Sequence, residues 1–204
     1  MLHHLRSLIS KSNKCYTNLT GQYYGCKLAR HLVHRLLVPQ VKELLHEEES
    51  SRNSEQQLQE QYEKVLIVIA QWCQPHLQVD PEKIRQTFDD MAEATFQKLK
   101  DLNAVDAKTI KSLADFKVIK KDSSLSRTVF DAANRYLESE GFTGNTDDYY
   151  SPENSYINRV LETKLGIPIS LSLMYACVLA RLGIHCQPIN FPRHFLLRYP
   201  RILT

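Results

Sequence analysis

Residues 166–184 read Gly-Ile-Pro-Ile-Ser-Leu-Ser-Leu-Met-Tyr-Ala-Cys-Val-Leu-Ala-Arg-Leu-Gly-Ile, and residues 185–198 read His-Cys-Gln-Pro-Ile-Asn-Phe-Pro-Arg-His-Phe-Leu-Leu-Arg. Nearly every residue from Ile169 to Leu182 is apolar or small, and a helix that is apolar on all sides is a buried helix. This helix is too short, and its flanks are too polar, to span a bilayer. The stretch therefore predicts a buried central helix, and we expect Leu173, Cys177 and Ala180 to lie inside.

Local signals bound this helix on both sides. Gly166 can end the preceding helix, because glycine tolerates the left-handed conformation found there. Pro168 suits the first position of the central helix, and Gly183 ends it. Two short strands are then expected, over Ile184–Ile189 and His194–Tyr199.

Two segments of this stretch resemble a known family. Residues 166–173 and 190–198 resemble the signature of the transglutaminase-like core of the bacterial SirB type (the SirB1 N-terminal domain), a module that some eukaryotic F-box proteins also carry. The resemblance is strong from Asp148 to Arg198. It extends more weakly through Gln71–Pro75 and the helix that follows, and more faintly from Tyr23 to Leu45.

The resemblance implies an α+β, mostly α fold. We expect a helical N-terminal region that leads into an incomplete transglutaminase-like (papain-like) core with a central buried helix and a short antiparallel sheet. The domain boundaries are then 1–22 for a disordered or frayed basic tail, 23–105 for the helical region and 106–204 for a SirB1-type domain truncated at its C-terminus.

Apolar periodicity predicts the earlier helices. Tyr24, Leu28, Leu32 and Leu36 fall four apart on one face of a helix over 23–38, which Pro39 ends or kinks. The polar run 47–61 is expected to be a linker or mobile loop. Further helices are expected over 62–72, 81–100, 124–138 and from Ser151 until Gly166, with a connection over 103–122 and a loop over 141–145.

Two of these helices carry start signals. Asp80 is the expected N-cap of the helix that begins with Pro81, and Ser151 is the expected N-cap of its own helix. The face of the first helix that we expect to be buried consists of Ile84, Phe88, Met91, Thr95, Phe96 and Leu99.

The composition is that of a globular protein, with 43% hydrophobic and 24% charged residues. Five cysteines without paired spacing and no secretory segment indicate a reducing compartment, cytoplasmic and/or nuclear. Mitochondrial targeting by residues 1–20 is a minor alternative. Residues 1–42 contain seven Lys/Arg and no acid. The helix over 23–38 could contact acidic lipid, nucleic acid or an acidic partner, although a solvated outer face is the preferred interpretation.

The resemblance also implies a chemistry. In this fold a cysteine at the start of the central helix attacks a carbonyl, a histidine on a strand activates it, and an Asp or Asn orients the histidine. His194 matches the histidine, but Pro168–Ser172 contains no cysteine. Cys177 lies about two turns further along the helix, and Cys186 follows the helix, so neither replaces the missing thiolate.

Ser170 and Ser172 lie in the correct turn, yet a hydroxyl gains less than a thiol from a helix dipole. We expect them to cap the helix or fill a close contact. No catalytic residue is therefore assigned, and Ser170, Ser172 and His194 are vestigial candidates. No cofactor or metal is expected, because Cys73 and His76 have no second pair at ligand spacing.

The expected function is that of a non-catalytic protein-interaction module, a pseudoenzyme similar to the substrate-recruiting region of an F-box subunit of an SCF-type E3 ubiquitin ligase. The alternative is a transglutaminase-like hydrolase or protease relative that uses Ser170 or Ser172 with His194. Expected partners are a protein substrate or ligase subunits, whereas binding of the ligase adaptor is expected to be lost together with the F-box. The hemimethylated-DNA-binding-like domain is also expected to be absent. Neither nucleic acid nor a membrane is an expected partner.

Overall fold

The computed structural model describes residues 2–11, 19–50, 55–101, 123–192 and 194–198. These ranges are mostly helical with little sheet, which confirms the expected α+β, mostly α class. No helix within them is both long enough and apolar enough to cross a membrane. The elements are α1 (Leu2–Lys11), α2 (Leu19–Ser50), α3 (Glu55–Cys73), α4 (Pro81–Asp101), α6 (Ser123–Ser139), β1 (Thr143–Gly144), the 3₁₀ helix η1 (Pro152–Ser155), α7 (Ile157–Thr163), β2 (Leu165–Gly166), α8 (Pro168–Arg181), β3 (Gln187–Phe191) and β4 (His194–Arg198).

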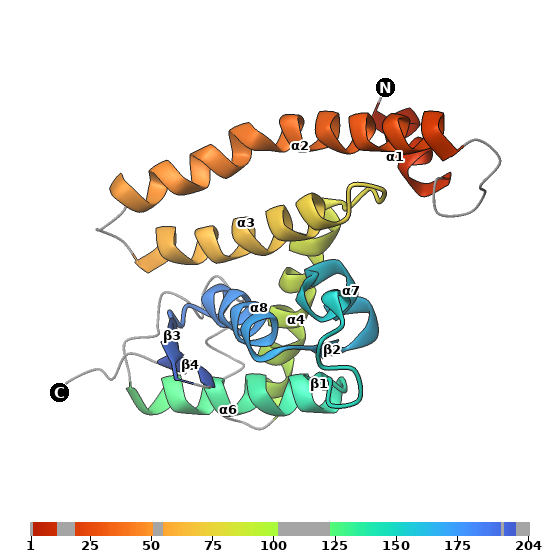
Figure 1. The fold of residues 1–204 in the computed structure, drawn as a ribbon. Coiled ribbons are helices and arrows are strands. Elements are labelled where there is room, and N and C mark those ends of the chain that lie inside the picture. Colours follow the sequence, from red (N-terminus) through yellow and green to blue (C-terminus); the bar gives the residue numbers. More distant parts are fainter. Residues whose placement is uncertain (1, 12–18, 51–54, 102–122, 193, 199–204) are drawn as a thin grey trace.

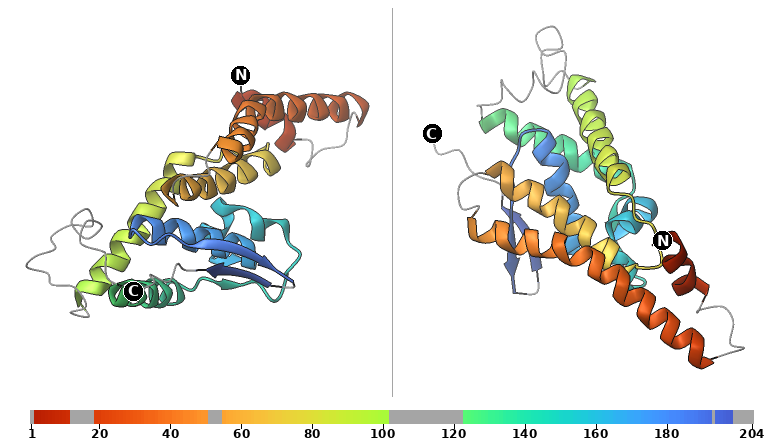
Figure 2. Two further views of the ribbon diagram at one scale, coloured as in Figure 1. Left: turned by 90° about the vertical axis from the view of Figure 1, so that its left-hand side faces the viewer. Right: turned by 90° about the horizontal axis from the view of Figure 1, so that it is seen from above.

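The helices form a stack with α8 in the middle. Figure 1 shows α2, α3, α8 and α6 from top to bottom, and the left view of Figure 2, turned about the vertical axis, keeps that order. Helix α8 contacts α3, α4, α6 and strand β4. The central position predicted for this helix is therefore confirmed.

Burial along α8 is less uniform than its sequence predicts. Leu173 and Cys177 are buried, at 8% and 1% exposure, as expected. Ala180 is only half-buried, and Ile169 in the first turn is 48% exposed. The middle of the helix thus lies in the core, while Pro168 and Ile169 in its first turn are exposed.

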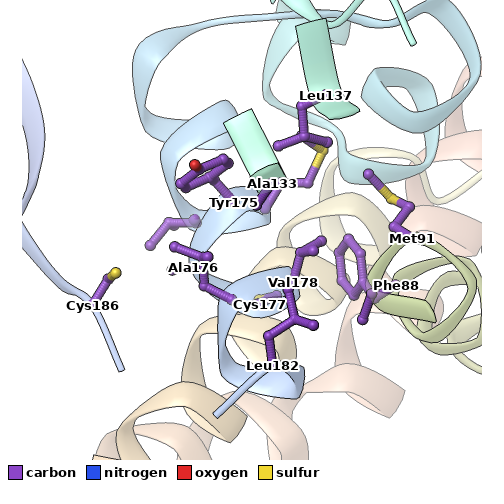
Figure 3. Packing of buried hydrophobic residues seen from close by; sticks show 14 of the residues in the cluster. Phe88, Met91, Ala133, Leu137, Tyr175, Ala176, Cys177, Val178, Leu182 and Cys186 are labelled. Atoms are coloured by element: carbon purple, nitrogen blue, oxygen red, sulfur yellow. The ribbon is translucent and has the colours of Figure 1, made fainter. Parts of the chain in front are cut away.

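The main core forms where α4 and α6 pack against α8 (Figure 3). Phe88 and Met91 of α4 and Ala133 and Leu137 of α6 are buried there beside Val178. The predicted buried face of α4 is confirmed for all six of its residues. The predicted helix over 124–138 is confirmed as α6.

The C-terminal strands form an antiparallel hairpin, with Phe191 paired to His194 and Gln187 paired to Arg198. The first strand begins at Gln187, three residues later than predicted. Ile184 and Cys186, which the prediction included in this strand, are buried just before it. The second strand agrees with the prediction up to Arg198, where the described residues end. Phe195 and Leu197 are half-buried, Leu197 packs against the main core, and Leu196 between them is 49% exposed.

Two of the predicted boundary signals are confirmed. The carboxylate of Asp80 accepts hydrogen bonds from the backbone N–H groups of Glu82 at 3.0 Å and Lys83 at 3.4 Å, as an N-cap residue does. Gly183 ends α8 with a φ of 72°, and its neighbour Ile184 donates to the carbonyl of Leu179 at 2.8 Å.

Two other boundary signals are wrong. Ser151 precedes a 3₁₀ turn, η1, and makes no capping hydrogen bond through its side chain. Lys164, not Gly166, takes the left-handed position after α7, with a φ of 64°. Gly166 instead lies in β2, which pairs in parallel with β1. Strand β1 lies in the segment over 141–145 that was predicted to be a loop. A Cβ added to Gly166 would lie 2.9 Å from both Leu171 Cγ and Ser170 Oγ, so close packing accounts for this glycine.

Helix α2 differs most from its prediction. It continues through Pro39 to Ser50, and α3 already begins at Glu55, so most of the expected linker over 47–61 is helical. Pro39 and Arg35 are exposed, and Pro39 lacks the N–H that would bind the carbonyl of Arg35. The helix packs inward through Ala29, Val33 and Leu37.

The N-terminal segment also differs from the expected tail. Residues 2–11 form α1, which packs against α2, and Ile9 is buried with Ala29 and Val33 in a small second cluster. The predicted helix over 62–72 lies within α3, although Ile69 on it is 39% exposed. The predicted connection over 103–122 lies outside the described residues.

Candidate functional site

The first turn of α8 holds the position that the family resemblance assigns to a nucleophile. Ser170 is 2% exposed there. Its hydroxyl accepts a hydrogen bond from the backbone N–H of Ile167 at 3.2 Å and lies 2.6 Å from the carbonyl oxygen of Asn154, to which it donates. A side chain at the third helical position that accepts from the N-cap N–H forms half of a capping box. The expected capping role of Ser170 is thus observed.

Asn154 connects this turn to the preceding loop. Its side-chain amide donates to the carbonyl oxygens of Asp148 at 2.7 Å and Tyr149 at 3.1 Å, and its Oδ1 accepts from Asn145 at 3.0 Å. The residue is 3% exposed. We did not predict its role, because a buried amide in a single 3₁₀ turn leaves no periodic signal in the sequence.

The three vestigial candidates lie on two elements, the serines on α8 and the histidine on β4. His194 begins β4 as an exposed residue, and Ser172 is half-buried on α8. The hydrogen bonds of the Ser170 hydroxyl go to Asn154 and to the backbone of Ile167. Within the described part of the chain, no hydrogen bond joins either serine hydroxyl to the His194 ring.

Exposed apolar side chains lie near the start of α8 and on the loop that Asn154 ties to it. Ile169 is 48% exposed, Tyr149 51% and Tyr150 92%. The two tyrosine rings meet edge to face, with centroids 5.2 Å apart. We call Tyr149, Tyr150 and Ile169 the loop patch. The exposed Asp147 and Asp148 precede it, so the patch combines apolar groups with negative charge.

The two cysteines closest to this region in sequence are buried. Cys177 is 1% and Cys186 4% exposed. Burial raises the pKa of the Cys177 thiol, the carboxylate of Glu63 raises that pKa further, and the guanidinium of Arg181 opposes the shift. At neutral pH this thiol is therefore protonated and does not supply a thiolate nucleophile.

A pocket of about 670 Å³ lies at the opposite end of α8. Arg181, Glu63, Arg85 and Asp89 line it, together with His185. Glu63 accepts from Arg181 Nη2 at 2.7 Å and from Arg85 Nε at 2.9 Å, and Asp89 pairs with Arg181 Nε. The pocket charges therefore connect α3, α4 and α8 to one another.

The residues considered for a metal lie at the end of α3 and just after it. Cys73 and His76 are exposed, and the Trp72 ring stacks on His34 with centroids 4.3 Å apart. The His34 ring also makes a 2.9 Å hydrogen-bond contact with the Trp72 carbonyl oxygen. In the described ranges, no group of three or more His, Cys, Asp or Glu side chains could hold a metal ion.

Comparison with known proteins places these features in a family. Residues 82–203 match the family model described as "Transglutaminase-like superfamily". "F-box only protein 21" of Homo sapiens is 30% identical over 182 residues, which is 89% of this chain and 28% of that protein, and its Mus musculus counterpart matches equally. A "UPF0162 protein" of Xylella fastidiosa (strain Temecula1 / ATCC 700964) is 51% identical over 70 residues, 34% of this chain and 25% of that protein. The chain thus spans about a quarter of the length of these relatives. No solved structure matches it.

Proposed function

The chain belongs to the transglutaminase-like superfamily, and we propose that it acts in it as a non-catalytic protein-interaction module. In this proposal it serves as the substrate-recruiting region of a subunit of an SCF-type ubiquitin ligase. Its partner is a protein substrate or another ligase subunit.

The hydrogen bonds of Ser170 are the observation that carries the proposal. The first turn of α8 contains no cysteine, and the buried Ser170 hydroxyl already binds backbone groups of Asn154 and Ile167. A serine becomes a nucleophile only when a base accepts its proton, and His194 is not hydrogen-bonded to it. The turn that holds the nucleophile in the family fold thus contains a serine here whose hydroxyl is hydrogen-bonded to the backbone.

The relatives support the ligase part of the proposal. The similarity to F-box only protein 21 covers 89% of the length of this chain. The loop patch supplies a surface for a substrate, because exposed aromatic and aliphatic side chains are typical of contact sites in interfaces. The exposed Asp147 and Asp148 beside it favour a partner segment that is apolar with basic residues next to it.

A gain-of-function experiment tests the proposal. The whole chain is fused to the RING domain of a ubiquitin ligase and expressed in cells, and ubiquitylated proteins are quantified by mass spectrometry. We expect the fusion to ubiquitylate a defined set of proteins that the RING domain alone leaves unmodified. Tyr150→Ser combined with Ile169→Ser should remove that set, whereas Leu77→Ser, at a side chain 40% exposed elsewhere, should preserve it.

An experiment on the purified chain separates this proposal from the catalytic alternative. A serine-directed fluorophosphonate probe should leave the purified chain unlabelled. A stoichiometric adduct on Ser170 or Ser172 that disappears in His194→Ala would contradict the non-catalytic proposal. A fusion that ubiquitylates the same proteins as the RING domain alone would contradict the recruiting role.

A further inference from the structure

The outward face of α2 carries a row of exposed apolar side chains. Tyr24 is 62%, Leu28 59% and Leu36 48% exposed, and Leu32 between them is half-buried. No other helix in the described ranges has more than one large hydrophobic side chain exposed. Figures 1 and 2 show α2 at the outside of the helical stack, and the exposed fractions show that Tyr24, Leu28 and Leu36 are not covered by it. We call these four residues the α2 ridge.

The spacing of the ridge is that of a helix-packing surface. Residues four apart on a helix form an inclined ridge, and such ridges fit between the ridges of a second helix that crosses at about 50°. The inner face of α2 already uses Ala29, Val33 and Leu37 within this protein. The ridge is therefore a second helix-packing surface, directed outward.

The charges beside the ridge are mainly positive. From Leu19 to Lys42 the helix contains four Lys/Arg and no Asp or Glu, and the exposed Glu43 follows. Lys27, Arg30, Arg35 and Lys42 are all exposed. A surface with this balance attracts a partner of negative charge and repels one of positive charge.

The positions of these cations favour a protein helix over a membrane. Arg35 and Lys42 follow Tyr24 by about three and five full helical turns, so they lie on the same side of α2 as Tyr24. A helix that lies in a membrane interface separates its apolar side from its cations, and here insertion of Tyr24 would bury Arg35. A crossing helix can meet the ridge with its leucines and the cations on the Tyr24 side with its carboxylates.

We propose that the α2 ridge and its exposed cations form a docking site for an acidic amphipathic helix of a partner protein. Apolar side chains of that helix, three or four residues apart, pack between Leu28 and Leu36. Its Glu or Asp side chains pair with Arg35 and Lys42. This site lies on α2, whereas the loop patch lies on α8 and the loop before η1. The inference therefore does not depend on the function proposed above.

A selection experiment tests the site with peptides in place of a natural partner. A library of displayed helical peptides, with leucine at every fourth position and Glu, Lys, Gln or Ala elsewhere, is selected against the immobilised full chain. We expect enrichment of peptides rich in Glu. The best peptide should bind about tenfold more weakly to Leu28→Ser combined with Leu36→Ser, and also to Arg35→Glu. Added salt should weaken its binding to the unmodified chain, because the cations are exposed.

Controls make each outcome decisive. Leu196→Ser removes a leucine with 49% exposure on β4 and should leave peptide binding unchanged. Thermal melts must show that all variants are folded. The proposal is overturned if no peptide is enriched, if Lys-rich peptides are enriched, or if binding persists in the double variant. Phosphatidylserine vesicles and duplex DNA are tested in parallel, and binding of either in place of the peptides also overturns it.

Discussion

The side-chain oxygen of Ser170 lies 2.6 Å from the carbonyl oxygen of Asn154, sixteen residues earlier in the chain. The same carbonyl accepts the backbone N–H of Ile167 at 3.3 Å. Both Ser170 and Asn154 are almost completely buried. The start of α8 is thus fixed to η1 by polar contacts, and these contacts lead directly to the first prediction.

Ser170→Ala should destabilise the fold by about 1–3 kcal/mol, because it leaves buried hydrogen-bonding groups without their partner. Urea denaturation measures the change. Ser172→Ala is the matched control in the same helix, where the side chain is half-buried, and should change stability by less than about 0.5 kcal/mol. Equal effects of the two substitutions would contradict the structural role of Ser170.

Gly166→Ala and Gly25→Ala should change stability in opposite directions. An added Cβ at Gly166 meets Leu171 Cγ and Ser170 Oγ at 2.9 Å, so the segment must shift, at a cost of about 1–3 kcal/mol. At Gly25, inside α2, nothing lies within 4 Å of the added atom. Alanine there should stabilise the helix by about 0.5–1 kcal/mol. Thermal melts that shift in the same direction for both variants would disprove this account.

Glu63→Ala should be one of the most costly charge deletions in this chain. The carboxylate binds both Arg85 and Arg181, and the Glu63 and Arg181 side chains are only 14% and 18% exposed. Removal of one partner of a buried ion pair costs about 3–5 kcal/mol. Glu82→Ala deletes an 82% exposed partner of Arg85 and should cost less than about 1 kcal/mol. Similar denaturation midpoints for the two variants would show that the pocket charges do not hold α3, α4 and α8 together.

Stability should fall in alkaline solution, partly through Cys177. Burial raises the pKa of its thiol in the folded state, so its contribution is fully present below the ordinary thiol pKa of about 8.5. Above that pH the unfolded chain releases the proton and the folded chain retains it, which lowers stability by up to about 1.4 kcal/mol per pH unit. Burial also raises the pKa of Tyr175, which adds a second loss above about pH 10.

Urea denaturation of the unmodified chain and of Cys177→Ala between pH 7 and 10 tests this linkage. The variant should show the smaller decline with pH, whatever its stability at pH 7. Cys73 is exposed, so Cys73→Ala should decline as the unmodified chain does. Parallel declines for all three proteins would contradict the proposed role of Cys177.

Local signals predicted the parts of the fold that depend on one segment at a time. Asp80 and Pro81 begin α4, and Gly183 ends α8, because caps act within one turn of the chain. The buried face of α4 followed from its period, as did the existence of α6. The strand pattern likewise placed His194 at the start of the second strand.

Tertiary contacts decided the features that the sequence did not predict. Pro39 remains inside α2 because it lies on the exposed side of a long helix. The apolar row from Tyr24 to Leu36 faces outward, since the smaller Ala29 and Val33 fit the contact with α1. In the candidate site, the hydrogen bonds of Asn154 join residues from separate turns, so no spacing in the sequence indicates them.

The small cluster of Ile9, Ala29 and Val33 is separate from the main core, and this division has a consequence for folding cooperativity. Segments with few buried apolar contacts open at lower free energy than the core, in units that amide hydrogen exchange resolves. Backbone amides of α1 and the first half of α2 should therefore exchange through a local opening. Those of α4 and α8 should exchange only when the whole chain unfolds. We therefore expect the N-terminal helices to detach and re-form as a unit while the transglutaminase-like core remains folded.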